Sequence, residues 1–447
     1  MSITVTAIVL AAGKGTRMRS ARPKVLHLLA GWPMIGHILL ATDRAGVNRT
    51  MVVLGHGADL VRAALPPGTL SVVQEPQLGT GHAVKVALDS LHGEDTDVAL
   101  ILNGDIPLIR PETLCLLLRS HARGGHTLTL LSALVSDPHG YGRVLRADDG
   151  RVIALKEQKE LTPSEEAVNE INCGVYVASM RWLRRAAAAL PVHPDGEYYL
   201  PDLVPRAMAE GGAGVVRVDD AAEGQGVNTR VELAAAEALM RRRINAAHML
   251  AGVTMIAPEL TYIDPGVSIG QDTILYPNTY LRGETAIGMN CVIGPDADLR
   301  NASVGDGTQI FRSMVDASRI GRDCLVGPFA RLRPGTVLED GVEIGTCAEV
   351  KNSTIGTGSA CHHFSYIGDT TIGSGTNIGA GAVTCNYDGV RKYPTVIGDN
   401  VFVGSGTMLR APVTLGDGSR TGAGAVVLHD VAAGTTVAGV PARTIGE

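Results

Sequence analysis

Three segments in the first half of the chain could together hold a triphosphate and a metal ion. The Gly-rich stretch Leu10–Arg17 follows an apolar run, Lys24 comes shortly after it, and Asp105 follows another apolar run. Glycines let backbone N–H groups face a phosphate, and a helix beginning after the loop would add its dipole. Carboxylate and phosphate oxygens are the ligands that Mg²⁺ prefers. The sequence therefore predicts a site for triphosphate and metal.

No single part of this pattern is specific. The loop is not a Walker A motif, and Met18 stands where a dinucleotide-binding loop would have its third Gly. Asp105 could instead cap a helix that begins near Pro111. The combination of Gly loop, Lys and Asp favours the phosphate interpretation.

A second group of ionisable residues lies in the other half of the chain. Glu349, Lys351, His363 and Tyr366 fall within about one coil length of a repeat, and Arg333 precedes Lys351 by a full coil. A histidine on a repeat strand is usually a surface residue, although it can act as a general base near neutral pH. Because residues about 18 apart lie above one another in such a repeat, Glu349 and Lys351 are expected near His363.

The repeat itself predicts the architecture of the second half. An aliphatic residue followed by Gly recurs in steps of six, as in Ile287-Gly288, Ile293-Gly294 and Ile378-Gly379. Such a repeat is typical of a β-solenoid with three short strands per coil, aliphatic side chains inside and Gly, Asp or Asn at the corners. The clearest interruption runs from Thr384 to Thr395. A polar loop ejected from a regular solenoid is more often functional than decorative.

The first half shows a different pattern. Apolar runs alternate with amphipathic segments, which predicts a mostly parallel sheet between helices, with ligands at the carboxyl ends of its strands. A run of strong helix formers over 228–251 predicts a connecting helix of about 24 residues that stops at Gly252. The expected strands are 4–10, 50–54, 70–74, 98–103 and 127–135, and the expected helices are 33–45, 81–91 and 111–122.

Composition excludes several classes of protein. The 447 residues carry a net charge of −6 and have no long run of Lys or Arg, so nucleic acid is not an expected partner. Neither a signal peptide nor a stretch of roughly 20 apolar residues is apparent, so we expect a soluble, cytoplasmic protein without a membrane partner. Seven Cys without C-x-x-C spacing suggest neither a disulfide framework nor a zinc site.

A set of short motifs occurs in order before the solenoid. They are L-A-A-G-K-G-T-R-M, P-K-V-L-H, Q-L-G-T-G-H-A, G-D-I-P-L, G-Y-G-R, N-E-I-N-C-G and G-V-N-T-R. With the solenoid, they resemble the family of bifunctional N-acetylglucosamine-1-phosphate uridyltransferases and glucosamine-1-phosphate N-acetyltransferases. The resemblance covers nearly the whole chain. Its first motif alone is shared with many sugar-nucleotide pyrophosphorylases.

This resemblance implies an organisation and a pair of reactions. It implies an α/β protein with a Rossmann-like uridyltransferase domain in 1–227, a linker helix in 228–252 and a left-handed parallel β-helix acetyltransferase domain in 253–447. The second domain would acetylate glucosamine 1-phosphate with acetyl-CoA. The first would then transfer UMP from UTP to N-acetylglucosamine 1-phosphate, with Mg²⁺ as cofactor, and release pyrophosphate. The family also implies a homotrimer with acetyltransferase sites between neighbours.

The resemblance assigns the residues of the first site by their positions in the motifs. The nucleophile would be a phosphate that is already anionic, so cations that offset repulsion are required and a general base is not. Arg17 and Lys24 are the expected catalytic cations. The other expected substrate-binding residues are Leu10, Ala11 and Gly13 in the Gly loop, Gln74, Gly79 and Thr80 for uracil, and Gly142, Glu157 and Asn172 for the sugar. Asp105 and Asn228 would hold Mg²⁺, and Asn228 also counts as substrate-binding.

The second site is assigned in the same way. His363 would be the general base, oriented by Glu349, because an amine attacks a thioester only when it is neutral. The expected binding residues for glucosamine 1-phosphate are Arg333, Lys351, Tyr366, Asn377 and Lys392, with Asn386 and Tyr387 from the ejected loop. Ala380, Ser405 and Ala423 would line the acetyl-CoA groove, and Arg443 would meet the phosphate of the coenzyme.

Two alternatives stay open. A pyrophosphorylase with one function could use the solenoid only for assembly or regulation, but the loop at 384–395 and His363 argue against this. A binding scaffold that shares both folds would not need Lys24 and Asp105.

Overall fold

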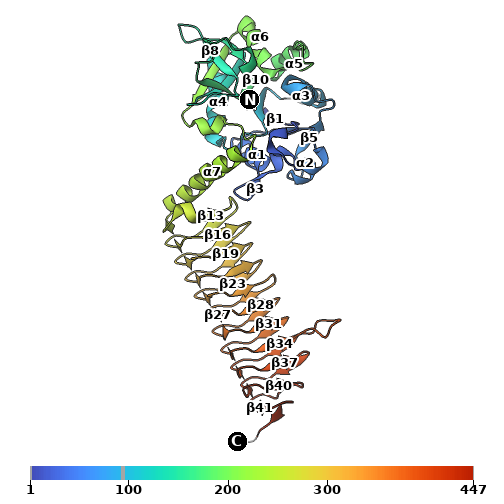
Figure 1. Ribbon diagram of the computed structural model, residues 1–447, viewed down its shortest axis with the longest axis vertical. Helices are drawn as coiled ribbons and strands as arrows, with labels where there is room; N and C mark the ends of the chain where they lie inside the picture. The colour runs from blue at the N-terminus through green and yellow to red at the C-terminus, as the bar shows by residue number, and fades with distance from the viewer. Residues whose placement is uncertain (1–2, 92–95, 446–447) are drawn as a thin grey trace. The chain divides into compact units, whose positions relative to one another are not determined.

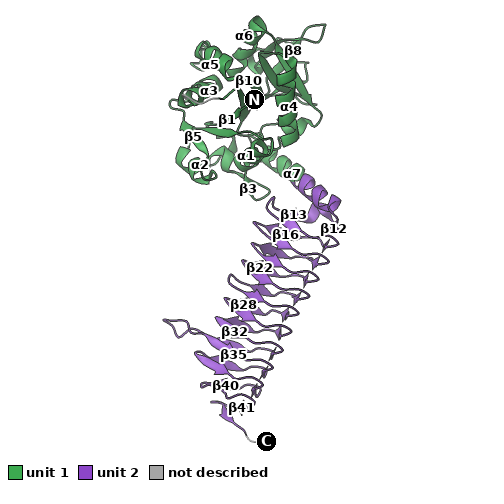
Figure 2. Cartoon of the chain, turned by 180° about the vertical axis from the view of Figure 1, so that it is seen from behind, with its two compact units in different colours: residues 1–240 green, residues 241–447 purple. Residues whose placement is uncertain are grey.

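The computed structural model describes residues 3–91 and 96–445. The predicted domain ends at residues 1 and 447 therefore lie outside the described residues. The chain divides into two compact units, 1–240 and 241–447 (Figure 2).

The first unit is built on one mixed sheet. Its strand order is β11-β7-β10-β6-β1-β4-β5, and β10 alone on this path runs antiparallel to its neighbours. A hairpin of β8 and β9 joins through β10. The strands are β1 Val5–Ala11, β4 Arg49–Leu54, β5 Leu70–Val73, β6 Val98–Asn103, β7 Leu128–Leu134, β8 Arg143–Arg146, β9 Val152–Lys156, β10 Glu170–Ser179 and β11 Ala213–Val218, with a separate pair β2 Leu28–Leu29 and β3 Trp32–Pro33.

Alternation along the central strand sends side chains into two separate cores. Ile8 of β1 packs with residues of α3, α5 and α6, whereas Ala7 and Val9 pack with residues of α1, α2 and α4. All three side chains are fully buried. The sheet is therefore covered by helices on both faces, as predicted (Figure 1). The helices are α1 Met34–Arg44, α2 Ala58–Ala64, α3 Gly79–Ser90, α4 Pro111–Gly124, α5 Met180–Ala188 and α6 Leu203–Glu210.

The expected connecting helix is present as α7, Arg230–Leu250. It has 21 residues, somewhat fewer than predicted, and Gly252 follows it with φ near 100°. Positive φ without strain requires glycine, which explains the stop.

The second unit is a solenoid of three parallel sheets, which we call faces 1, 2 and 3. The stacked coils are visible in Figure 1. Face 1 contains β12 Thr254–Met255, β15 Ile274–Leu275, β18 Val292–Ile293, β21 Gln309–Ile310, β24 Leu325–Val326, β27 Glu343–Thr346, β30 Ala360–His363, β33 Asn377–Ile378, β36 Phe402–Val403, β39 Arg420–Thr421, β41 Thr436–Ala438 and an antiparallel end strand, β42 Arg443–Thr444. Face 2 contains β13 Thr261–Ile263, β16 Thr279–Arg282, β19 Asp298–Arg300, β22 Met314–Asp316, β25 Arg331–Leu332, β28 Glu349–Lys351, β31 Tyr366–Gly368, β34 Val383–Cys385, β37 Met408–Arg410 and β40 Val426–Val427. Face 3 contains β14 Ser268–Ile269, β17 Ala286–Ile287, β20 Ser303–Val304, β23 Arg319–Ile320, β26 Val337–Leu338, β29 Thr354–Ile355, β32 Thr370–Ile372, β35 Thr395–Ile397 and β38 Val413–Leu415.

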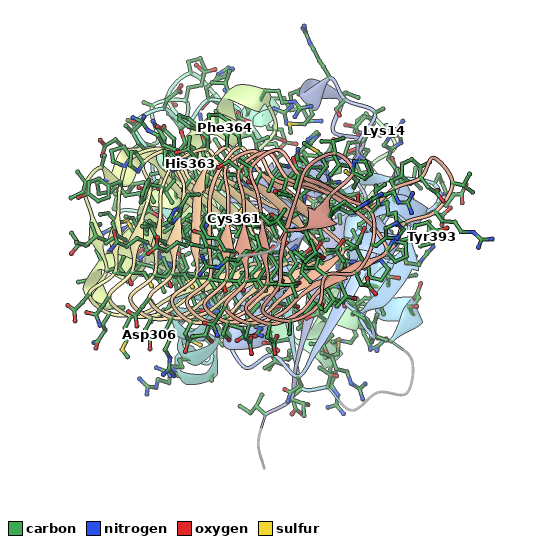
Figure 3. The ribbon with its side chains drawn as sticks, turned by 90° about the horizontal axis from the view of Figure 1, so that it is seen from below. Lys14, Asp306, Cys361, His363, Phe364 and Tyr393 are labelled. Carbon is green, nitrogen blue, oxygen red and sulfur yellow. The ribbon has the colours of Figure 1, made fainter. Side chains whose placement is uncertain are left out.

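The inward positions of each coil form a continuous apolar core. On face 1, Ile344, Cys361 and Ile378 stack in successive coils and are nearly inaccessible to solvent. Looking along the coils, Figure 3 shows Cys361 inside the prism and His363 with Phe364 at its surface. Small buried Cys residues thus serve as ordinary core positions, as expected.

Coil length varies from turn to turn. Leu281 and Leu299 pair 18 residues apart, Leu299 and Val315 pair 16 apart, and Val350 and Ile367 pair 17 apart. Across the ejected loop, Val383 of β34 pairs with Met408 of β37, 25 residues further on. The interruption near Thr384 is therefore a loop that leaves the strand ladder intact, and it projects from the stack in Figure 1.

Candidate active sites

A cavity of about 920 Å³ opens at the carboxyl ends of the strands in the first unit. Leu10 ends near it on β1 and Asn103 on β6, which are neighbouring parallel strands. Most of the residues predicted for the first site line this cavity: Leu10, Ala11, Gly13, Arg17, Lys24, Gln74, Gly79, Thr80, Asp105, Glu157 and Asn228.

The Gly loop is held open by its own backbone conformation. Gly15 has φ near 60°, and a Cβ there would lie 2.7 Å from Cβ of Lys24. The loop is followed by a single 3₁₀ turn, Thr16–Met18, and the next α-helix begins only at Met34. The predicted helix dipole at this loop is therefore wrong. Backbone N–H groups and side-chain cations remain as the local sources of positive charge.

Lys24 meets two predicted metal ligands at once. Its ammonium lies 2.5 Å from a carboxylate oxygen of Asp105 and 3.0 Å from the carboxamide oxygen of Asn228. The backbone of Asp105 is fixed by Val227, whose N–H donates to the Asp105 carbonyl at 2.8 Å. The side chain of Asp105 does not cap α4, because Arg110 holds the N-cap position. Two oxygen donors thus converge on one positive charge.

These donors fit a hard divalent cation, with further ligands needed. Across residues 3–91 and 96–445, no three His, Cys, Asp or Glu side chains gather as a metal-binding group. Magnesium commonly binds one or two carboxylates and takes its remaining oxygens from phosphates and water. A metal held by Asp105 and Asn228 would therefore depend on the substrate for its other ligands.

The residues predicted to recognise uracil form one hydrogen-bonded corner. The carboxamide of buried Gln74 donates to the carbonyl of Gly79 at 2.9 Å, and the hydroxyl of Thr80 accepts from the N–H of Leu200 at 3.1 Å. A Cβ at Gly79 would lie 2.6 Å from the carbonyl oxygen of Tyr198. The corner is therefore packed against a loop from far along the chain.

The residues predicted for the sugar lie together at another wall. A Cβ at Gly142 would be 3.7 Å from both carboxylate oxygens of Glu157, and the N–H of Asn172 donates to the carbonyl of Gly142 at 2.9 Å. Burial raises the pKa of Glu157, with a smaller contribution from nearby Glu160. Gly142 and Asn172 are thus neighbours of a cavity residue, although they do not line the cavity themselves.

Sequence reasoning missed several cavity residues. Gln77 donates to the carbonyl of Ala12 at 2.9 Å, and Lys159 and Tyr199 stand at the cavity wall. Gln77 lies inside the quoted Q-L-G-T-G-H-A motif, so that motif could have indicated it. Lys159 and Tyr199 belong to segments whose approach only the fold reveals.

In the solenoid, His363 heads a column at one corner. The N–H of Gly381 donates to His363, that of Gly406 to Ala380 and that of Gly424 to Ser405, so these residues occupy equivalent places in successive coils. Ala423 follows Ser405 by one further coil. The groove residues predicted for acetyl-CoA thus lie in line with the predicted base.

The imidazole of His363 is exposed, and within the described residues it makes no hydrogen bond. Glu349, which was expected to orient it, is hydrogen-bonded instead to Arg333 at 2.8 Å. Glu349 pairs in register with Tyr366, because the local coil has 17 residues and not 18. The neighbouring His362 bonds Glu343 at 2.7 Å.

Cations gather on the adjoining face 2. Arg333 stands one coil before Lys351, as predicted from the register of Leu332 with Val350. The ammonium of Lys351 lowers the pKa of Lys392, which arrives from the ejected loop. Two lysines held beside each other favour an anion between them. This wall therefore suits a phosphate.

The ejected loop is tied back to this wall through Asp369. Asn386 is buried and donates to Asp369 at 2.5 Å, and Asn352 donates to the same carboxylate at 2.7 Å. Burial would raise the pKa of Asp369, but these hydrogen bonds and the two lysines outweigh it and the pKa is lowered. A Cβ at Gly368 would lie 2.5 Å from the hydroxyl of Tyr366 and 2.7 Å from the carboxamide nitrogen of Asn386. Gly368 thus leaves room for both side chains.

Three predicted residues lie apart from this wall. Asn377 is on face 1, where it pairs with Ala360 and Phe402. Tyr387 is exposed, and its hydroxyl donates to Gly389 within the loop at 2.6 Å. Arg443 is exposed on the end strand, where it pairs with Ala438.

Comparisons with known proteins match both units. A MobA-like NTP transferase domain model matches residues 7–158, and a bacterial transferase hexapeptide model of six repeats matches 394–429. Relatives named "Bifunctional protein GlmU" include that of Desulfitobacterium hafniense (strain Y51), 46% identical over 433 residues, which cover 96% of this chain and 94% of the relative. Those of Clostridioides difficile (strain 630) and Mycolicibacterium gilvum (strain PYR-GCK) are 43% and 45% identical over 95% and 98% of this chain, and the aligned regions cover 93% and 90% of these relatives.

Proposed function

The chain belongs to the GlmU family of bifunctional proteins, and we propose that each of its compact units carries out one transfer reaction. It is a bifunctional transferase of UDP-N-acetylglucosamine biosynthesis. The solenoid, which we assign to 253–447, acetylates glucosamine 1-phosphate with acetyl-CoA. The domain of 1–227 then transfers UMP from UTP to N-acetylglucosamine 1-phosphate and releases pyrophosphate. Residues 228–252 link the two.

The observation that carries this proposal is that each unit brings together its own set of complementary groups. In the first unit, Lys24, Asp105 and Asn228 converge at the cavity that Arg17 also lines. In the second, His363 heads the column described above, on a coil that also carries Tyr366 of face 2.

In the uridylyl reaction, the phosphate of N-acetylglucosamine 1-phosphate attacks the α-phosphorus of UTP. The new P–O bond forms as the bond to pyrophosphate breaks, and no proton has to be removed from the nucleophile. Arg17 and Lys24 offset the repulsion between the two anions. Asp105 and Asn228 would hold Mg²⁺, which, when bound, neutralises phosphate charge. Glu157 and Gly142 receive the sugar.

In the acetyl reaction, the amine of glucosamine 1-phosphate attacks the thioester carbonyl of acetyl-CoA. His363 accepts the proton of the amine, and the thiol of coenzyme A leaves with a proton. Arg333, Lys351 and Lys392 bind the phosphate. Arg443 binds the coenzyme beyond the end of the column.

We propose a homotrimer as the working assembly. Asn377 is on face 1 while Lys351 and Tyr366 are on face 2, so one ligand that touches all three favours a face supplied by a neighbouring copy. The exposed Phe364 beside His363 adds apolar area suited to such a contact. We also propose a cytoplasmic location, since UTP and acetyl-CoA are the donors. No helix in the described part of the chain combines the length and apolarity needed to cross a bilayer.

Two substitutions separate the reactions. Purified Asp105→Ala is expected to lose pyrophosphate release from UTP and N-acetylglucosamine 1-phosphate while keeping thiol release from acetyl-CoA and glucosamine 1-phosphate. His363→Ala is expected to show the reverse. His362→Ala is the matched control, because that imidazole pairs with Glu343, and it should keep both activities. Loss of both activities in either folded single variant would refute the two-site assignment.

A further inference from the structure

Two separate segments meet across the wall of the uridylyl cavity through one charged contact. The ammonium of Lys159 donates to Asp195 at 2.9 Å and to the hydroxyl of Tyr199 at 2.6 Å. The Tyr199 hydroxyl also donates to Asp195, and the ammonium lies 4.7 Å from the centre of the Tyr199 ring. We call this group of three side chains the clasp. Both Lys159 and Tyr199 line the cavity.

One side of the clasp is rigidly joined to the sugar wall. Lys159 belongs to the 3₁₀ turn Gln158–Glu160, and Glu157 caps that turn in a reciprocal capping box with Glu160. Gln158 accepts from the guanidinium of buried Arg143 at 3.0 Å. A displacement of Lys159 would therefore move Glu157, which faces Gly142.

The other side is joined to the uracil corner. Tyr199 belongs to the loop that reaches the corner through Tyr198, whose N–H donates to the carbonyl of Leu78 at 2.9 Å and whose carbonyl accepts from Gly81 at 2.8 Å. His193 supports the same loop, with its ring centre 4.3 Å from that of Tyr199 and its imidazole 2.8 Å from Asp202. The clasp thus connects the wall for the sugar to the wall for the base.

We infer that Lys159 and Asp195 are positioning residues for the uridylyl reaction: their contact sets the distance between the Glu157 turn and the loop that carries Tyr199, and so sets the affinity for the acceptor sugar phosphate. This inference rests on the proposed function. The Lys159–Asp195 pair is about half exposed, so its energetic contribution is modest and salt-sensitive. Its opening should widen the sugar wall without removing any group that contacts the nucleotide phosphates.

The contact is complete at neutral pH. Hydrogen bonds with Asp195 and then Tyr199 raise the pKa of Lys159, and the hydrogen bond from Lys159 lowers the pKa of Asp195. Both groups are therefore charged under ordinary assay conditions.

The test is a steady-state comparison of Lys159→Met and Asp195→Asn with wild type. We expect each to raise the KM for N-acetylglucosamine 1-phosphate about three- to tenfold, with kcat and the KM for UTP within about twofold. Lys159→Arg should restore most of the affinity, and 0.5 M salt should weaken wild type more than either variant. Thiol release by the solenoid should be unchanged in all of them.

Lys156→Met is the matched control. Lys156 lies three residues earlier and makes an ion pair of 2.7 Å with Glu165, but it does not line the cavity. Its loss removes the same charge from the same end of the sheet. We expect its KM values to stay within about twofold of wild type.

Each other outcome overturns the inference. Unchanged acceptor KM in both clasp variants removes the positioning role, and an increase in Lys159→Met alone would mean that Lys159 contacts the substrate directly. An equal increase in Lys156→Met would point to general charge loss. If wild type released no pyrophosphate, the proposed function would fail as well, whereas normal wild-type turnover with an unaffected acceptor KM would remove the clasp alone.

Discussion

Replacing Lys24 with methionine should make the first site bind a divalent cation more tightly when no nucleotide is present. In the structure, the Lys24 ammonium takes the position between Asp105 and Asn228 that a metal would need. A metal can therefore reach both oxygens only if this ammonium moves away. Lys24→Met removes the competitor and leaves the two oxygen donors in place.

The size of the effect follows from the geometry. Two unit charges 2.5 Å apart attract by about 2 kcal/mol in a water-like medium and by about 7 kcal/mol at an effective dielectric constant near 20. The side chains of Lys24 and Asp105 are 14% and 18% exposed, and a displaced ammonium regains hydration, so the lower part of this range applies. About 1.4 to 2.8 kcal/mol corresponds to a ten- to hundredfold tighter Kd.

The assay is a titration with Mn²⁺, followed by its free paramagnetic resonance signal without nucleotide. Lys14→Met is the control, since Lys14 lines the same cavity and, in the described residues, makes no ion pair with Asp105. It should change the Kd less than threefold. An unchanged or weaker Mn²⁺ affinity in Lys24→Met would refute the view that Lys24 and the metal share one position. The variant should nevertheless lose uridylyl transfer, because the cation that faces the phosphates is gone.

Three further predictions concern charge and packing. Lys351→Met should raise the pKa of Lys392 towards its ordinary value, because the neighbouring ammonium that lowers it is removed; carbon NMR of labelled lysine across alkaline pH measures this, and an unmoved titration would contradict it. Glu170→Gln should destabilise the first unit by about 1–3 kcal/mol, since Arg146 loses its charged partner. The pKa of Glu170 is lowered in the fold, as hydrogen bonds from Arg146 and Ser132 outweigh burial, so this stability difference should be present above pH 4.5 and shrink as pH falls below it in denaturant titrations. Leu281→Ala, in the solenoid core, should cost about 2.7–5 kcal/mol and lower the Tm of the second unit, and a loss of uridylyl activity at 25 °C would contradict the independence of the units.

Strand ends were the part of the first site that sequence could predict well. The runs that end near Leu10 and at Asn103 form β1 and β6, and adjacent parallel strands bring the residues that follow them to one edge. The short 3₁₀ turn after the Gly loop was not predictable, since the loop's glycines fit either continuation. The contact of Lys159 with Asp195 joins residues 36 apart in the sequence, and no local pattern encodes such a meeting.

In the solenoid, the repeat predicted the fold but not the register at every coil. Aliphatic spacing identifies inward positions such as Ile344 and Ile378, and both are buried. Trimmed corners change the coil length by one or two residues, and this is why Glu349 is level with Tyr366. A shift of one residue reverses the direction of a strand side chain, so small errors in coil length matter most for polar positions.

The column below His363 acts as a ruler for the acetyl donor. Successive coils of a parallel sheet are about 4.8 Å apart, so the three steps from His363 through Ala380 and Ser405 to Ala423 measure about 14 Å. A long, slender arm laid along these small side chains would present its thioester at the imidazole only if its far end stopped near Ala423. Thioesters on truncated arms should therefore reach the histidine without an anchorage, and the number of coils, more than any single side chain, would decide which donors are accepted.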